Sequence, residues 1–339
     1  MPDSLYHHLK TLTELSGPVG REFLVQQYME TQFSLHTESV AFDRVGNLQA
    51  HFPGEGPKTI IAAHACEVGF VVKNITEDGF LQIAPNYKTR VPDTRILPFH
   101  EVTIFTDTYQ SIDGVLTMDT GHVVDKESRE KVPSLDTILV DIGATSREEA
   151  YSSHLHVGCP LTWKAQTRKL NIRIKGKSMD DRLGLAILIQ LAAFLSKTSV
   201  TRDIFLASTV QEEIGVRGAH ALASQQTFDE AYILEIIPTS QRNQALRLGQ
   251  GPAIVYKDGS MHYHHPTIIK CRETAQNSNI PLQPAILERG ITDGLGFFVN
   301  SASRTALLGC PTLYPHSPGE TINSEDLSNL QHLMENILM

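Results

Sequence analysis

The 339-residue sequence lacks the features that would direct it to nucleic acid, a membrane or an oxidising compartment. It has no run of Lys or Arg and a net charge of −9, so nucleic acid and anionic membranes are poor partners. Neither the N-terminal MPDSLYHHLK nor any later segment resembles a signal peptide or a bilayer-spanning run. The four cysteines are scattered, without CxxC spacing. The sequence therefore predicts a reduced, cytoplasmic protein.

Outside its middle third, the chain alternates between helix-like and strand-like segments. Leu5, Leu9 and Leu12 recur at helical spacing, and Gly17-Pro18 ends that helix. The predicted helices are 4–16, 23–33, 183–195, 218–224, 266–277 and 324–339. The predicted strands are a hairpin over 39–50 and single strands over 59–63, 170–174, 204–209, 231–234 and 305–308. Such alternation predicts an α/β domain with a mostly parallel sheet flanked by helices.

The segment 68–163 has a different texture. Its apolar runs are short and rich in β-branched residues, with turn pairs such as Asp78-Gly79 between them. One short helix is predicted over 146–152, where Ser146 and Glu149 have capping-box spacing. We therefore predict a small β-rich domain over 68–163, inserted into a domain formed by residues 1–67 and 164–339.

Side chains that can bind a metal follow five of the predicted strands. They are His64, Asp180, Glu212, Glu213, Glu235 and His316. Ligand sites in open α/β sheets lie at the carboxyl ends of the strands, so these side chains are expected to meet at one edge. Mixed histidine and carboxylate ligands suit zinc, cobalt or manganese. Asp180 could bridge two such ions.

Each of these residues also has an ordinary structural explanation. A histidine after an apolar strand is more often a hydrogen-bonded core residue, and Asp180 and Asp181 could cap the helix that follows them. Glu235 could pair with an arginine, and His316 could be solvated. The adjacent glutamates could form the first turn of a surface helix, where the helix dipole favours them. We favour the metal site because it explains all five strand ends together.

Six motifs are spread along the chain. They are AHACEVGF, GKSMDDRLG, TVQEEIGVRGA, GQGPAI, ERGITDG and PHSPGE. In order and spacing these motifs resemble the tetrahedral aminopeptidase family, which comprises cytoplasmic dinuclear metallopeptidases, including glutamyl and deblocking aminopeptidases and members labelled endoglucanase. The resemblance covers nearly the whole chain. It implies the phosphorylase/hydrolase-like aminopeptidase architecture, with 68–163 as a PDZ-like domain for assembly into a homo-oligomer such as a dodecamer.

The resemblance also implies roles for individual residues. Two divalent ions, Zn, Co or Mn, would be held by His64, Asp180, Glu213, Glu235 and His316. Asp180 matches the bridging aspartate and Glu212 the general base. Two such ions lower the pKa of a shared water and polarise the scissile carbonyl, while Glu212 passes the proton of the water to the leaving amine. Thr292 and Asp293 match a loop that lines the site, where Asp293 would contact the substrate amine.

Two positions depart from the family pattern. Cys66 stands where the motif His-x-Asp-Glu-(Val/Ile)-Gly has an aspartate that orients the ligand histidine. Loss of such a partner typically costs about 10–100-fold in metal affinity or activity. A neutral thiol is a weak acceptor, a thiolate could hold the imidazole or bind the metal, and a merely buried cysteine would fit a less active enzyme. Glu235 replaces another aspartate, and its extra methylene requires the backbone or the metal to shift.

The expected function is removal of N-terminal residues from short peptides by a dinuclear metallo-aminopeptidase. Cys66 motivates the main alternative, a degenerate family member that binds metal or peptide with weak or no turnover. A glycoside hydrolase is less favoured. Its chemistry needs a pair of carboxylates flanking a sugar bond, whereas every candidate acid here is accompanied by histidine.

Overall fold

The computed structural model describes residues 1–87, 92–242 and 245–339. The chain divides into two compact units, one formed by Met1–Cys66 with Gln166–Met339 and the other by Glu67–Ala165. Among the described residues, none of the helices is long and apolar enough to cross a membrane.

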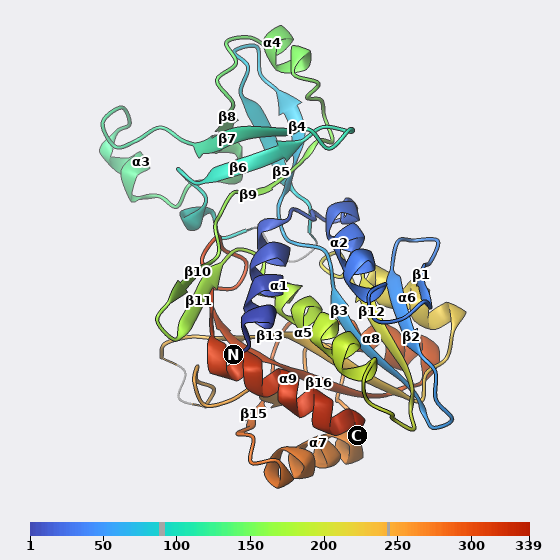
Figure 1. The fold of residues 1–339 in the computed structure, drawn as a ribbon. Helices are drawn as coiled ribbons and strands as arrows, with labels where there is room; N and C mark the ends of the chain where they lie inside the picture. The colour runs from blue at the N-terminus through green and yellow to red at the C-terminus, as the bar shows by residue number, and fades with distance from the viewer. Residues whose placement is uncertain (88–91, 243–244) are drawn as a thin grey trace. The chain divides into compact units, whose positions relative to one another are not determined.

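The larger unit is built on a mixed sheet of eleven strands (Figure 1). Nine of them run in the order β1 (Val40–Phe42), β2 (Leu48–Phe52), β12 (Asp203–Thr209), β3 (Lys58–His64), β13 (Glu230–Thr239), β16 (Arg304–Leu313), β17 (Glu320–Asn323), β11 (Arg173–Gly176) and β10 (Arg168–Leu170). Only β12, β3, β13 and β16 pair in parallel along this path. The prediction of a mostly parallel sheet therefore holds for the centre and is wrong for the flanks.

Burial explains why the parallel pairs lie at the centre. β13 is buried at its first eight positions and β16 at all but its first, as expected for strands covered on both faces. On one face, Ala63 of β3 lies against Gly184 of α5 (Met179–Leu195). On the other, Phe228 stacks edge-on between Phe205 of β12 and Phe297 of α8 (Gly294–Ser301). The two helices thus cover opposite faces of the sheet.

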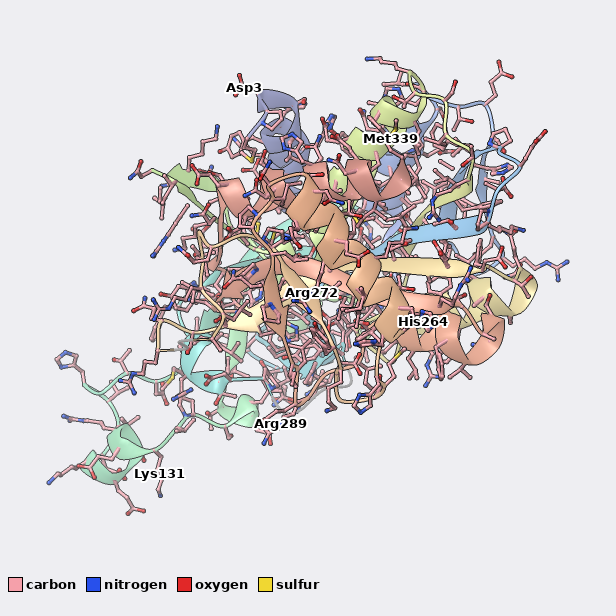
Figure 2. The ribbon with its side chains drawn as sticks, turned by 90° about the horizontal axis from the view of Figure 1, so that it is seen from below. Asp3, Lys131, His264, Arg272, Arg289 and Met339 are labelled. Atoms are coloured by element: carbon pink, nitrogen blue, oxygen red, sulfur yellow. The ribbon has the colours of Figure 1, made fainter. Side chains whose placement is uncertain are left out.

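The other helices of this unit begin and end close to where they are predicted. They are α1 (Asp3–Glu14), α2 (Phe23–Phe33), α6 (Arg217–Gln225), α7 (His265–Asn277) and α9 (Ser324–Leu338). Pro266 lies in the first turn of α7, where its missing N–H costs no hydrogen bond. His264 lies at the N-terminal end of α7 and Arg272 on its exposed side (Figure 2).

Several strands differ from their predictions. The single strand predicted over 170–174 is a hairpin, β10 and β11, that reverses near Asn171 in the left-handed region (φ 58°). β13 and β16 run on to Thr239 and Leu313, paired along their whole length, so Glu235 lies within its strand and not after it. The short elements β14 (Ala253–Val255), β15 (Gln283–Ala285), β17 and α8 were not predicted. They are too short to show a period in the sequence.

The smaller unit is a closed antiparallel barrel, which confirms the prediction of a β-rich insertion. Its strands run in the order β4 (Phe70–Ile75), β5 (Leu81–Pro85), β8 (Leu139–Asp141), β7 (Ser111–Thr117), β6 (Glu101–Phe105) and β9 (Pro160–Trp163). Val102, Ile104, Val140 and Leu161 belong to its fully buried core. The short helices of this unit are η1 (Thr94–Ile96), α3 (Lys126–Glu130), η2 (Leu135–Thr137) and α4 (Arg147–Ser152). Ser146 caps α4 as predicted, accepting from the Glu149 N–H at 3.2 Å.

Candidate metal centre

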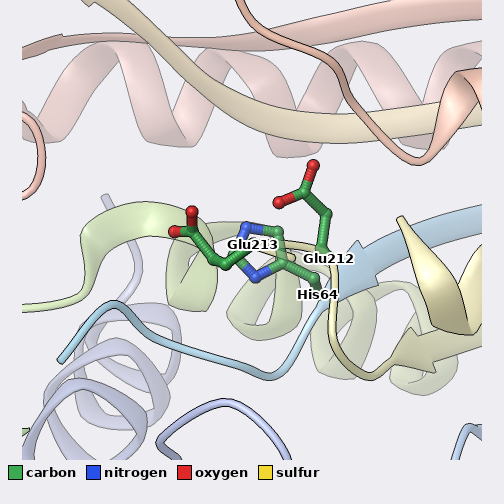
Figure 3. Close-up of side chains that lie close together, drawn as sticks. All are labelled: His64, Glu212 and Glu213. Carbon is green, nitrogen blue, oxygen red and sulfur yellow. The ribbon is translucent and has the colours of Figure 1, made fainter. Parts of the chain in front are cut away.

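The carboxyl ends of the central strands bring the predicted glutamates to His64. His64 ends β3 and is paired in register with Thr209, the last residue of β12. The chain then turns and places Glu212 and Glu213 beside the imidazole, with their carboxylates on either side of the ring in Figure 3. Both glutamates are buried and precede α6, so the surface-helix alternative for this pair is wrong.

Three distant groups hold the turn that carries these glutamates. Asn47 Oδ1 accepts from the Val210 N–H at 2.9 Å, and Glu22 Oε1 accepts from the Gln211 N–H at 3.1 Å. The Glu212 N–H donates to the Cys66 thiol, with the nitrogen 3.1 Å from Sγ. Successive backbone donors are thus satisfied by side chains from three other segments, which fixes where the two carboxylates point.

Asp180 lies between the two histidines. Its Oδ1 is 2.9 Å from His64 Nε2 and its Oδ2 is 3.1 Å from His316 Nε2. Asp180 and Asp181 have non-helical dihedral angles within the span of α5, and Asp181 caps the turns that follow, because its Oδ1 accepts from the Gly184 N–H at 3.1 Å. The capping alternative therefore describes Asp181 and does not describe Asp180.

Two groups of possible metal ligands share the Asp180 carboxylate. The first is His64, Asp180 and Glu235, and the second is Asp180, Glu213 and His316. Within each group the donor atoms lie within 4.8 Å of one another. Glu235 Oε2 is 3.7 Å from His64 Nε2, and Glu213 Oε1 is 3.5 Å from His316 Nε2. Glu235 therefore reaches the site from within β13, whereas the sequence predicts that it follows the strand.

The charge balance of these groups favours a cation. Burial raises the pKa of Glu213, Glu235 and Glu212, because an ionised carboxyl loses its hydration. Burial has the same effect on Asp180, but hydrogen bonds from His316 and His64 outweigh it and lower the pKa of this carboxyl. So many buried acidic groups are costly unless positive charge lies among them.

The residues present fit two divalent ions. Each ligand group combines one imidazole nitrogen with two carboxylates, a donor set typical of zinc, cobalt or manganese. Glu213 Oε1 is buried and accepts no hydrogen bond from the described residues, so it keeps lone pairs for an ion. Asp180 offers one oxygen to each group, as a bridging ligand must.

Cys66 lies on the side of the His64 ring that faces away from Asp180. His64 Nδ1 is 3.0 Å from the Cys66 carbonyl oxygen and 3.5 Å from Sγ. A carbonyl can only accept, so Nδ1 carries a proton, and Nε2 is the nitrogen that would bind a metal. Burial raises the pKa of the Cys66 thiol to about 12, which keeps it neutral beside the imidazole.

The predicted loop residues Thr292 and Asp293 are both buried. The Thr209 hydroxyl donates a short hydrogen bond to Asp293 Oδ2, while Oδ1 has no hydrogen-bond partner among the described residues. Burial raises the pKa of Asp293 to about 6. Thr292 Oγ1 is 2.8 Å from the Tyr263 hydroxyl, which donates to Asp258 Oδ2 at 2.7 Å. Thr292 thus holds the loop, and Asp293 presents a free oxygen.

Sequence reasoning missed several residues that support the site. Asn47 lies within the hairpin predicted over 39–50 and was given no role, although it is fully buried under the glutamate turn. Glu22 and Glu320 were given no role, although each accepts two backbone N–H groups. The only signal for Glu320 is its place in PHSPGE, four residues after His316. Its contacts are long-range and leave no periodic pattern.

Comparisons with known proteins identify the family of this chain. Residues 46–333 match the profile of the M42 glutamyl aminopeptidases. The lysyl aminopeptidase of Pyrococcus furiosus is 28% identical over 340 residues, covering 97% of this chain and 95% of that protein. A TET aminopeptidase from a marine-sediment Thaumarchaeota archaeon superposes with a TM-score of 0.93 at 26% identity, covering 99% of this chain and 97% of that one.

Two further solved structures show the same similarity. The TET1 peptidase of Pyrococcus horikoshii, described as assembling into a tetrahedron or a large octahedral shell, has a TM-score of 0.90 at 27% identity, covering 99% of each chain. PhTET1-12s, described as a dodecamer, has a TM-score of 0.90 at 26% identity, covering 100% of this chain and 99% of that one. The profile spans most of the sequence and the relatives align over their whole length. This chain belongs to the M42 glutamyl aminopeptidase family, whose members are hydrolases of peptide bonds.

Proposed function

We propose that this protein is a dinuclear metal-dependent aminopeptidase that removes N-terminal residues from short peptides. The observation that carries the proposal is the Asp180 carboxylate, which lies between the imidazoles of His64 and His316 and is shared by two ligand groups. His64, Asp180 and Glu235 would hold one ion, and Asp180, Glu213 and His316 the other. When bound, such ions supply a water of lowered pKa and polarise the scissile carbonyl.

The residues of the chain supply the remaining steps. Glu212 lies beside His64 and Glu213, and its carboxylate takes the proton of the attacking water and returns it to the leaving amine. Asp293 Oδ1 has no hydrogen-bond partner among the described residues, and it binds the free ammonium group of the substrate. Thr292 holds the Asp293 loop through Tyr263. An unblocked N-terminus is then required, which makes the reaction that of an exopeptidase.

The two units have separate roles in this proposal. Residues 1–67 and 164–339 form the catalytic domain, and 68–163 form the PDZ-like assembly domain of a homo-oligomer, such as a dodecamer. The assemblies described for the TET1 peptidase of Pyrococcus horikoshii and for PhTET1-12s support this assignment. The four cysteines are free and buried, which fits a cytoplasmic protein.

Hydrolysis of aminoacyl anilides tests the proposed function. The protein is stripped with a chelator, reloaded with Zn, Co or Mn, and assayed on a panel of anilides and their N-acetylated counterparts. We expect metal-dependent cleavage of the free-amine substrates and none of the acetylated ones, because the ammonium group positions the substrate. Absence of turnover with every metal, despite two bound ions, would favour the degenerate-member alternative.

Replacement of Cys66 by aspartate is expected to raise activity. The carboxylate would accept from both His64 Nδ1–H and the Glu212 N–H, the two groups that now lie near the carbonyl and the thiol. We expect kcat/KM of Cys66→Asp to rise by about 10-fold, the low end of what such an orienting partner contributes. Cys66→Ser, which keeps a small neutral group, should stay near the wild type. A fall in the aspartate variant would mean that the thiol itself takes part in the chemistry.

A further inference from the structure

Glu320 is a buried carboxylate that touches the backbones of two proposed metal ligands. Its Oε1 accepts from the His316 N–H at 2.6 Å and its Oε2 accepts from the Asp180 N–H at 3.2 Å. The residue is 1% exposed, so these hydrogen bonds are formed away from solvent. Both of its oxygens therefore bind main-chain donors, and it belongs to neither ligand group.

The fold explains how one side chain reaches both ligands. Glu320 begins β17 and is paired in register with Gly176, the last residue of β11. Asp180 lies four residues beyond Gly176, and His316 lies four residues before Glu320. The two loops leave the sheet side by side, with the Glu320 carboxylate between them.

The backbone near both proposed ligands adopts conformations that must be held by surrounding groups. His316 has φ 59° and Ser178, two residues before Asp180, has φ 54°. Residues with a side chain seldom adopt this left-handed region, and such conformations persist only where the surroundings hold them. Each oxygen of Glu320 accepts one main-chain N–H group, from Asp180 and from His316, so this one side chain holds both segments.

We propose that Glu320 is a positioning residue that fixes the separation of Asp180 and His316 through their backbone N–H groups. The inference rests on the proposed function, because that spacing matters only if the two side chains bind metal. The substrate is not touched by Glu320. Glu320 affects hydrolysis through the geometry of the second ligand group, Asp180, Glu213 and His316.

Two substitutions separate this role from a simple contribution of negative charge. Glu320→Gln keeps the length of the side chain but leaves one acceptor oxygen for two donors. Glu320→Asp keeps the charge but is one methylene shorter, so it cannot reach both donors. Glu325→Gln and Glu325→Asp are matched controls, because Glu325 is an exposed residue of α9 close in sequence.

The test measures Co²⁺ binding to the full chain. Calorimetry gives the affinity, and the visible absorption spectrum reports the ligand geometry. We expect both Glu320 variants to bind at least one ion about 10–100-fold more weakly, the usual effect of losing a group that orients a ligand. Their Co²⁺ spectra should also change, while those of the Glu325 variants should not. The thermal unfolding of each metal-free variant checks that it is folded, and if Glu320→Gln does not fold, Glu320→Asp decides.

Wild-type affinity and spectrum in both Glu320 variants would overturn the proposal. Weakening in Glu320→Gln alone, with Glu320→Asp unchanged, would also overturn it, because charge and not reach would then be responsible. Failure of the wild-type protein to bind Co²⁺ would instead contradict the proposed function itself. The two failures are therefore distinguishable.

Discussion

Glu212→Gln is expected to lower kcat by about 10²–10⁴-fold, the range that a positioned general base contributes, while both metal ions stay bound. The amide has the size of the carboxyl but cannot take a proton from water. Glu212 forms a possible ligand group with His64 and Glu213 but belongs to neither group that contains Asp180, so under the proposed arrangement metal content should remain at the wild-type value. Steady-state hydrolysis of an aminoacyl anilide gives kcat, and elemental analysis of the same sample gives the metal content.

The adjacent glutamate provides the matched control for this experiment. Glu213 is a member of the second ligand group, so Glu213→Gln should lose metal as well as activity. A Glu212→Gln protein that kept near-wild-type kcat would show that another group removes the proton. Loss of metal from Glu212→Gln would assign Glu212 to the ligands instead.

Asp180→Asn should have the largest effect on the metal centre. One carboxylate oxygen lies near each histidine, and the substitution replaces one of the two oxygens with an NH₂ group and removes the negative charge. Both ligand groups then lose their common member. We expect the purified variant to retain neither ion after dialysis, and its hydrolysis to fall at least as far as that of Glu212→Gln. Elemental analysis and calorimetric titration with Zn²⁺ measure the loss.

Glu235→Asp serves as the comparison for Asp180→Asn. It keeps a carboxylate in the first ligand group and restores the residue that the family usually has at this position. Two ions should stay bound to it. If Asp180→Asn also retained two tightly bound ions, Asp180 would not be the bridging ligand and the dinuclear arrangement would need a different centre.

Much of the site could be predicted because its residues follow strong local patterns. His64 ends the apolar run 59–63, and the glutamate pair follows the run 204–209. Such runs identify strands, and the strand-end rule for α/β sheets then brings their following residues together. The same rule predicts that Glu235 follows the strand over 231–234. In the structure Glu235 lies within the strand, because β13 continues to Thr239.

The parts that could not be predicted depend on distant contacts. Asn47 binds the backbone of a residue 163 positions away, and Glu22 one that is 189 positions away. Neither hydrogen bond leaves a pattern in the hydropathy of the segment around Asn47 or Glu22. The antiparallel pairing of β10, β11 and β17 was missed for a related reason, since these strands have three or four residues each and the sequence predicts only one strand over 170–174.

The hydrogen bond between His64 and the Cys66 carbonyl has a consequence for how this site can change in evolution. A main-chain oxygen is present whatever residue occupies position 66, so the imidazole keeps its tautomer when the side chain there drifts. The orientation of this histidine therefore depends on the path of the backbone more than on the side chain at position 66. A motif search that demands aspartate at position 66 would reject this chain, although the constraint that the aspartate satisfies is still met in part by the polypeptide itself.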